Sequence, residues 1–136
     1  MTNIVLLSTE ETWPIRHKVM WPDHPIDFVK LPNDADGRHF GLYLETDLVS
    51  VISIFTENNE VQFRKFATLQ EYQGKGFGTR LLTEIMRIVA QEKVSKIWCN
   101  ARITKTDFYG KFGMRPTETR FTKAGIDYVI MERSFH

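Results

Sequence analysis

The chain has 136 residues, of which 42% are hydrophobic and 26% charged, which is typical of one globular domain spanning residues 1–136. Its 18 basic and 17 acidic residues give a formal net charge of +1, so we expect neither nucleic acid nor a membrane surface as a partner. The single cysteine, Cys99, excludes an internal disulfide and the usual Cys/His zinc sites, and no apolar run approaches the roughly 20 residues that span a bilayer. The amino terminus lacks the pattern of a secretory signal, so we expect a cytoplasmic protein.

The first part of the chain predicts a strand, a helix and a loop. Residues 4–7 form a short apolar run, and Ser8 or Thr9 is suited to cap the helix that follows, with Pro14 in its first turn. Proline, aspartate and glycine make residues 22–38 a loop. Because long loops in compact domains tend to be functional, we interpret this segment as a flap over a site.

The remaining elements predict a mixed sheet. Three strand-like segments joined by short polar turns indicate an antiparallel meander, over residues 38–45, 48–56 and 61–69. An amphipathic helix covers residues 76–92, and a crossover through it makes the next strand, 96–101, parallel to 61–69. A short helix over 104–112 and strands over 117–122 and 126–133 follow. The fold class is therefore α/β (α+β), with a mixed, mostly antiparallel sheet flanked by helices.

The segment between the third strand of the meander and the long helix is rich in glycine. It reads Gln73-Gly74-Lys75-Gly76-Phe77-Gly78-Thr79. Helix starts leave backbone N–H groups unpaired at a positive dipole end, and glycine lets the chain approach an anion closely. The dinucleotide pattern G-x-G-x-x-G fails, because its sixth position is Thr79 counted from Gly74 and Leu81 counted from Gly76. The triphosphate pattern G-x-x-x-x-G-K-[ST] is also absent from the sequence.

Two motifs carry a family resemblance. Gln73-x-x-Gly76-x-Gly78 matches the pattern Q/R-x-x-G-x-G/A, and 108–114 reads Phe-Tyr-Gly-Lys-Phe-Gly-Met, close to F-Y-x-K-x-G-F with Met114 in the last position. Over residues 60–133 the chain therefore resembles the GNAT family of N-acetyltransferases. The resemblance implies that the parallel strands splay apart and that acetyl-CoA lies between them. It also implies direct acyl transfer without a covalent enzyme intermediate and without a metal.

The resemblance also assigns roles to individual residues. Tyr109 is implied as the general acid that protonates the departing thiolate; the alternative is an aromatic side chain packed on the core or the cofactor. Lys75 is either a phosphate contact or a solvated loop lysine, and Asn100 either a contact to the pantetheine arm or a polar strand end. The implied acetyl-CoA-binding residues are Phe66, Ala67, Thr68, Gln73, Gly74, Lys75, Gly76, Phe77, Gly78, Thr79, Asn100, Phe108 and Lys111.

The base that accepts the proton of the amine stays open among Glu57, Glu60, Glu71, His39 and water. The segment 121–131 resembles the ElaA-like subgroup of the family, where the sequence runs close to G-I-x-H-x-x-M; here Tyr128 stands in place of the histidine. Arg16 or Trp21 either lines the acceptor pocket or belongs to the core or surface. Cys99 lies in an apolar strand, so we expect it to be buried and inert.

These observations predict an acetyl-CoA-dependent N-acetyltransferase that acts on a primary amine of a small molecule. A protein or peptide amine is the second candidate acceptor, and a non-catalytic sensor of acyl-CoA is the candidate from another class. Fold analogy does not supply the acceptor. Whether the protein is a monomer or a homodimer, and which acyl chain it prefers, stays open.

Overall fold

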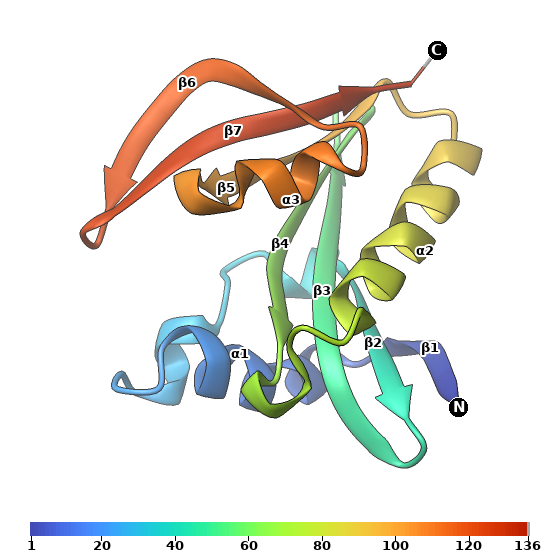
Figure 1. Ribbon diagram of the computed structural model, residues 1–136, viewed down its shortest axis with the longest axis vertical. Helices are drawn as coiled ribbons and strands as arrows, with labels where there is room; N and C mark the ends of the chain where they lie inside the picture. The colour runs from blue at the N-terminus through green and yellow to red at the C-terminus, as the bar shows by residue number, and fades with distance from the viewer. Residues whose placement is uncertain (136) are drawn as a thin grey trace. The chain divides into compact units, whose positions relative to one another are not determined.

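The computed structural model describes residues 1–135. Seven strands form a mixed sheet in the order β1-β2-β3-β4-β5-β7-β6 (Figure 1). The pairs β1-β2, β2-β3, β5-β7 and β6-β7 are antiparallel, and β4-β5 is parallel, as predicted. The strands are β1 (Thr2–Leu7), β2 (Arg38–Leu44), β3 (Asp47–Glu57), β4 (Glu60–Thr68), β5 (Lys96–Arg102), β6 (Arg115–Lys123) and β7 (Ile126–Ser134). The α-helices are α1 (Thr9–Met20), α2 (Phe77–Gln91) and α3 (Thr106–Gly110).

The chain divides into two compact units. The amino-terminal unit comprises Met1–Phe55 and Lys65–Ile85, and the carboxyl-terminal unit comprises Thr56–Arg64 and the described part of Met86–His136. Strands β3 and β4 and helix α2 contribute residues to both units. Within residues 1–135, no helix combines the length and the apolar character needed to cross a membrane.

Helix α1 begins where the sequence predicts. The Ser8 hydroxyl accepts a hydrogen bond from the Glu11 N–H at 3.4 Å, and the Glu11 carboxylate accepts one from the Ser8 N–H at 2.8 Å, which completes a capping box. The prediction that Pro14 lies in the first turn was wrong. Because the cap fixes the start of the helix at Thr9, Pro14 falls in the second turn, where its ring removes a backbone N–H.

The predicted loop over residues 22–38 contains two short 3₁₀ turns, η1 (Ile26–Val29) and η2 (Asp34–Asp36). Val29 and Asp34 from these turns are buried. The segment is therefore an ordered loop, which sends side chains into the core of its unit and is held there by an ion pair. Its role as a flap over a site stays a prediction.

That ion pair joins Arg16 of α1 to Asp34 of η2. The Arg16 side chain is fully buried, and its Nη1 and Nη2 donate to the two carboxylate oxygens of Asp34 at 2.9 and 3.0 Å. Nη1 also donates to the Val29 carbonyl at 3.1 Å, and Nη2 to the Ser53 hydroxyl at 2.9 Å. Nε has no hydrogen-bond partner among the described residues. A guanidinium fork paired with a carboxylate in this way connects α1, η1, η2 and β3.

His39 extends the same network. His39 Nε2 donates to the Asp34 carbonyl, which can only accept, at 2.9 Å. His39 Nδ1 and the Ser53 hydroxyl form a second hydrogen bond at 2.6 Å. The ring is 3% exposed and both of its nitrogens are engaged. These bonds make His39 an unfavourable base, although the identity of the base stays a prediction. The buried Arg16 belongs to the core, which is one of the placements that the sequence left open for it.

The carboxyl-terminal unit contains the β5-β7-β6 layer, with α3 running alongside it (Figure 1). Ala124 and Gly125 have φ values of 52° and 77°, which is the left-handed pair that a tight hairpin between β6 and β7 requires. The predicted helix over 104–112 was too long: a 3₁₀ turn, η4 (Ile103–Lys105), precedes the short α3. The chain then reverses through Gly113, whose φ is 82°.

We expect Asp34→Asn to lower the free energy of unfolding by about 3–5 kcal/mol, because it leaves the buried Arg16 charge without its counter-ion. Urea denaturation measures this loss. Asp27→Asn is the matched control from the same segment: Asp27 is 81% exposed and pairs with Lys30 at 2.7 Å, so its loss should cost less than about 1 kcal/mol. Equal losses in the two variants would contradict a stabilising role for the buried pair.

The same pair makes stability depend on pH. Burial alone would raise the pKa of Asp34, but the hydrogen bond from Arg16, the Leu31 N–H and the Arg16 charge outweigh it and lower that pKa. A lowered pKa in the folded state means that the contribution is complete above the unfolded pKa of about 3.9 and is lost as pH falls through the folded value. The acid limb of the stability curve should therefore be shallower in Asp34→Asn than in the wild type.

Candidate active site

The glycine-rich segment lies in the amino-terminal unit, between the 3₁₀ turn η3 (Gln70–Tyr72) and α2. Gly74 and Gly76 have φ values of 77° and 87°, and a Cβ at either position would meet no atom within 4 Å. These two glycines are therefore needed for backbone conformation. Gly78 differs, since its Cβ would lie 3.2 Å from Thr68 Oγ1 and 3.3 Å from Phe66 Cζ, so here close packing of α2 on β4 excludes a side chain.

The amide groups of this segment are unpaired. Arg80 donates the first hydrogen bond of α2, to the Gly76 carbonyl at 3.0 Å. Within residues 1–135, none of the backbone N–H groups from Gly74 to Thr79 donates to a protein acceptor. The exposed Lys75 lies nearby, with Nζ 5.9 Å from the centre of the Tyr72 ring. Unpaired N–H groups at the positive end of a helix, next to a lysine, form a site that suits an anion.

Hydrogen bonds attach this loop to the end of β4. Gln73 Nε2 donates to the Thr68 carbonyl at 2.8 Å. Ser50 of β3 bonds the Ala67 carbonyl at 3.2 Å and the Thr68 hydroxyl at 2.8 Å. The Gln73 side chain therefore positions the loop, and the Thr68 carbonyl already has one partner within the protein.

The parallel ladder between β4 and β5 is short. It contains Glu60–Gln62 against Lys96–Trp98 and ends there, while β5 continues to Arg102 and stays paired with β7 as far as Tyr128. Shortly after the ladder ends, β4 carries Lys65 with a φ of 54°, a left-handed residue typical of a bulge. Within residues 1–135, the edge of β5 beyond Trp98 that faces away from β7 therefore has no strand partner, and the exposed Asn100 lies on this stretch. The predicted parallel pairing of β4 and β5 is confirmed, with a ladder of three residues in each strand.

Tyr109 of α3 lies in the carboxyl-terminal unit among aromatic side chains. Its ring centre is 5.7 Å from that of Phe63 of β4 and 5.2 Å from that of Phe108, which in turn packs against Phe112. Burial raises the pKa of Tyr109 above its ordinary value, the neighbouring Cys99 adds to the rise, and the positive charge of Arg102 opposes it. The phenol therefore keeps its proton at neutral pH and is available as a hydrogen-bond donor. Lys111, directly after α3, is exposed.

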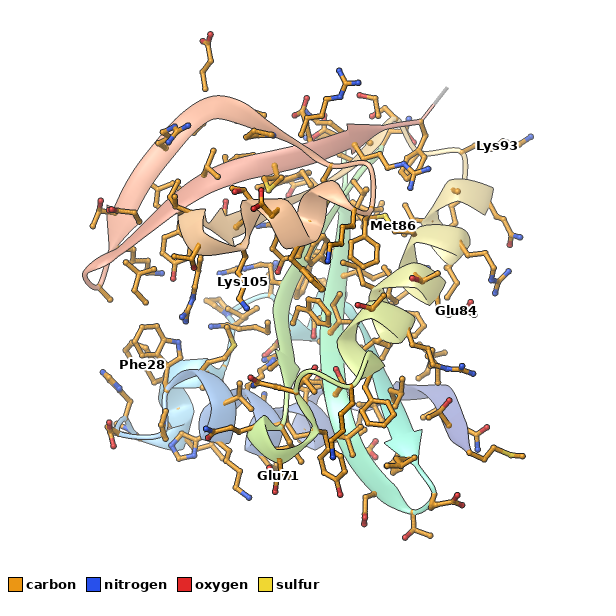
Figure 2. The ribbon with its side chains drawn as sticks, in the orientation of Figure 1. Phe28, Glu71, Glu84, Met86, Lys93 and Lys105 are labelled. Atoms are coloured by element: carbon orange, nitrogen blue, oxygen red, sulfur yellow. The ribbon has the colours of Figure 1, made fainter. Side chains whose placement is uncertain are left out.

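The three glutamates proposed as bases differ in position. Glu57 is exposed beside the turn between β3 and β4, and Glu60 lies 3.8 Å from Lys96. Glu71 is exposed on η3 and points outward in Figure 2. Their order of preference as the base stays open.

Two features of the site region were missed from the sequence. Trp21, His24 and Phe28 form an aromatic cluster with ring centres 4.3–5.2 Å apart, and Phe28 is 47% exposed (Figure 2). Arg102, partly buried at the end of β5, was also not predicted as a site residue, because no sequence motif contains it. Its electrostatic effect on Tyr109 and its cross-strand neighbour Tyr128 identify it as a candidate.

The comparisons with known proteins agree with this fold and loop. The family described as Acetyltransferase (GNAT) domain matches residues 29–135, and the chain therefore belongs to the GNAT family of acetyl-CoA-dependent N-acetyltransferases. The Bacillus subtilis (strain 168) protein YitI, described as an uncharacterized N-acetyltransferase, is 28% identical; the alignment covers 98% of this chain and 97% of YitI.

Solved structures share the fold. A crystal structure from Lactobacillus plantarum aligns with a TM-score of 0.88 and 21% identity over 99% of both chains. Escherichia coli ElaA aligns with a TM-score of 0.81 and 17% identity over 98% of this chain and 100% of ElaA. A Bacillus subtilis acetyltransferase in complex with CoA aligns with a TM-score of 0.78 and 18% identity over 100% of both chains. The predicted resemblance to the family, with ElaA among the structural neighbours, is confirmed.

Cys99 should be unreactive in the folded protein. It is 2% exposed, and burial raises its pKa to about 12, so at pH 8 only about one thiol in 10⁴ is a thiolate. We expect iodoacetamide at pH 8 to leave Cys99 unmodified in native protein, measured by mass spectrometry, and to alkylate it fully in guanidinium chloride. Rapid modification of the native protein would contradict this placement.

Proposed function

We propose that the protein transfers the acetyl group of acetyl-CoA directly to a primary amine of a small molecule. The observation that carries this proposal is the run of unpaired N–H groups from Gly74 to Thr79 at the start of α2. A diphosphate fits such a run of donors. The CoA bound by the structural neighbour from Bacillus subtilis supports the choice of ligand.

The residues predicted to bind the cofactor fall into three groups in this proposal. The backbone of Gln73–Thr79, with Lys75, holds the pyrophosphate. Main-chain groups of Phe66, Ala67 and Thr68 align the pantetheine arm as an added strand would. Asn100, on the part of β5 without a strand partner, hydrogen-bonds the arm, and Phe108 and Lys111 contact the cofactor from the region of α3.

Tyr109 acts as the acid. The amine nitrogen attacks the thioester carbonyl carbon, and a tetrahedral oxyanion forms. The C–S bond then breaks, the sulfur leaves with the electron pair, and the phenol of Tyr109 gives it a proton. The attacking nitrogen gives up one proton to a base or to water, so the products are an amide and neutral CoA thiol. Because burial keeps Tyr109 protonated, the acid is in its competent form at neutral pH.

Direct transfer agrees with the state of the only thiol. Cys99 is buried and protonated, so it provides no nucleophile for an acyl-enzyme. The base is water or one of the glutamates Glu57, Glu60 and Glu71. We favour water, because Glu57 and Glu71 point into solvent and Glu60 lies beside a lysine.

The burial of Tyr109 favours a small acceptor. Its ring is partly buried among Phe63 and Phe108. In this proposal the thioester carbon lies next to Tyr109, where a small amine reaches it more readily than a side chain on the surface of a folded protein. A peptide amine remains the second candidate. Release of free CoA thiol, followed with a panel of small amines and peptides, decides between them. Tight binding of acetyl-CoA with no thiol release for any amine would favour a sensor.

Tyr109→Phe tests the acid. The variant keeps the ring packing on Phe63 and removes only the hydroxyl. We expect kcat to fall about 10²- to 10⁴-fold, while the Kd for acetyl-CoA, measured by calorimetry, stays the same. Tyr43→Phe, a partly buried tyrosine of β2, is the control and should keep full activity. Unchanged kcat in Tyr109→Phe would remove this residue from the mechanism.

Gly76→Ala tests the anion loop against Gly125→Ala. Both glycines have positive φ, 87° and 77°, and at both a Cβ would meet open space, so each variant should lose about 1–2 kcal/mol of stability from backbone strain. We expect only Gly76→Ala to weaken acetyl-CoA binding, by about tenfold, because the strain turns N–H groups away from the pyrophosphate. Equal Kd values in the two variants would place the diphosphate elsewhere.

A further inference from the structure

A row of three side chains crosses the β5-β7-β6 layer of the carboxyl-terminal unit. Arg102 of β5 lies opposite Tyr128 of β7, and Tyr128 lies opposite Phe121 of β6. Directly opposed residues of antiparallel strands project from the same face of a sheet. The rings of Phe121 and Tyr128 stack at 5.2 Å between centres and 15° between planes. We call these three residues the Arg102 row.

The polar groups of the row lack partners in the protein. Among the described residues, the guanidinium of Arg102 has neither a hydrogen-bond acceptor nor a carboxylate, and the Tyr128 hydroxyl has no hydrogen bond. Arg102 and Tyr128 are partly buried, and Phe121 is 37% exposed. A partly buried guanidinium without a counter-ion is unusual, because burial of a charge is costly unless it is paired. The row therefore offers a forked cation beside a flat apolar surface.

The acids of this unit that are nearest along the strands are engaged elsewhere or lie away from Arg102. Asp127 accepts a hydrogen bond from the Thr122 hydroxyl at 2.6 Å, and Glu132 pairs with Lys96 at 3.1 Å. The charge of the segment has the same sign as Arg102: residues 102–123 include six basic residues and two acidic ones, although the whole chain has a net charge of +1. These residues are Arg102, Lys105, Lys111, Arg115, Arg120 and Lys123 against Asp107 and Glu118. The local field therefore attracts an anion.

The row begins close to the proposed acid. Arg102 is the last residue of β5, only the 3₁₀ turn η4 separates it from α3, and α3 carries Tyr109. The charge of Arg102 acts on the Tyr109 phenol, so the two side chains lie within electrostatic range of each other. An amine that attacks a thioester beside Tyr109 has the rest of its molecule within reach of Arg102.

We propose that the acceptor amine also carries a carboxylate, which Arg102 binds, and an apolar or aromatic group, which lies on Tyr128 and Phe121. Adjacent strands are about 4.8 Å apart, so the row spans about 10 Å, which suits a molecule the size of an aromatic amino acid. A guanidinium fork matches a carboxylate with two parallel hydrogen bonds. A single guanidinium balances one negative charge, whereas a phosphate group carries nearly two. This inference rests on the proposed acetyl transfer.

The test compares phenylalanine with phenylalaninamide, in which a neutral amide replaces the carboxylate, at saturating acetyl-CoA and at a pH where both amines are largely deprotonated. We expect the wild type to prefer phenylalanine. Arg102→Gln should raise the KM for phenylalanine about 10- to 100-fold, change kcat less than about threefold, and leave phenylalaninamide unaffected. Arg102→Lys keeps the positive charge but loses the guanidinium fork, so its KM for phenylalanine should lie between those of the wild type and Arg102→Gln. Arg115→Gln, which removes an exposed charge opposite Glu132 on the same layer, is the control; loss of its share of the local field should change the KM for phenylalanine less than about threefold.

Several outcomes would overturn the inference. A wild type that prefers phenylalaninamide excludes carboxylate recognition. An equal fall in kcat for both acceptors in Arg102→Gln means that Arg102 acts on the reacting carbonyl. A preference for phosphoethanolamine over ethanolamine that depends on Arg102 means that the anion is a phosphate.

A further measurement separates this inference from the proposed function. If acetyl-CoA neither stabilises the protein against heat nor releases thiol with any amine, the transfer itself fails. If thiol is released with neutral amines only, the carboxylate proposal alone fails. If acetyl-CoA binds without turnover, calorimetric titration of phenylalanine into the CoA-loaded protein decides: binding that Arg102→Gln abolishes supports the proposal, and absence of binding by the wild type overturns it.

Discussion

The parallel ladder between β4 and β5 ends after Gln62 and Trp98, and the proposed binding of the cofactor depends on that early end. If the two strands had stayed paired, the backbone N–H and C=O groups of β5 from Cys99 to Arg102 that face away from β7 would form hydrogen bonds with β4. Instead this stretch is paired on the β7 side only, and its other edge can accept a strand-like ligand. Lys65 of β4 lies three residues beyond the last paired position and has a φ of 54°, which a regular strand does not adopt. The sheet therefore has an unpaired strand edge in its middle, in addition to the edge strands β1 and β6 at its rims.

Much of the fold follows from local pattern. The alternation in the meander, the apolar stripe of α2 and the capping residue Ser8 each place an element within a residue or two of its observed bounds, because hydrophobic period and capping act over a few neighbouring positions. The errors have different origins. Pro14 was misplaced although the Ser8 cap that fixes the helix start is local. The ordered turns within 22–38 depend on distant contacts, because Arg16 meets Asp34 and Ser53 and His39 complete the network.

The candidate site shows the same division. The residues proposed to bind the pyrophosphate are contiguous in the sequence. Gly74 and Gly76 have positive φ values at the start of a helix, and a short sequence motif is enough to predict this conformation. The aromatic surroundings of Tyr109 require β4 to bring Phe63 beside α3, and its raised pKa follows only from that burial. His39 illustrates the reverse case. Its residue type suggests a base, and only the structure shows that both ring nitrogens are already bonded.

The Arg102 row explains why acceptor choice is hard to derive from sequence in such a fold. Its members lie on three different strands, and they meet only because of the β5-β7 and β6-β7 registers; a shift of one residue in either would turn Tyr128 to the opposite face. No motif spans positions 102, 121 and 128. In the proposed site, cofactor binding depends on one loop whose sequence is constrained by backbone geometry, whereas the proposed acceptor recognition depends on cross-strand pairing, which tolerates exchange of single side chains. A face of this kind can change its substrate by replacing one of three residues, while the loop at the start of α2 and the acid on α3 stay as they are.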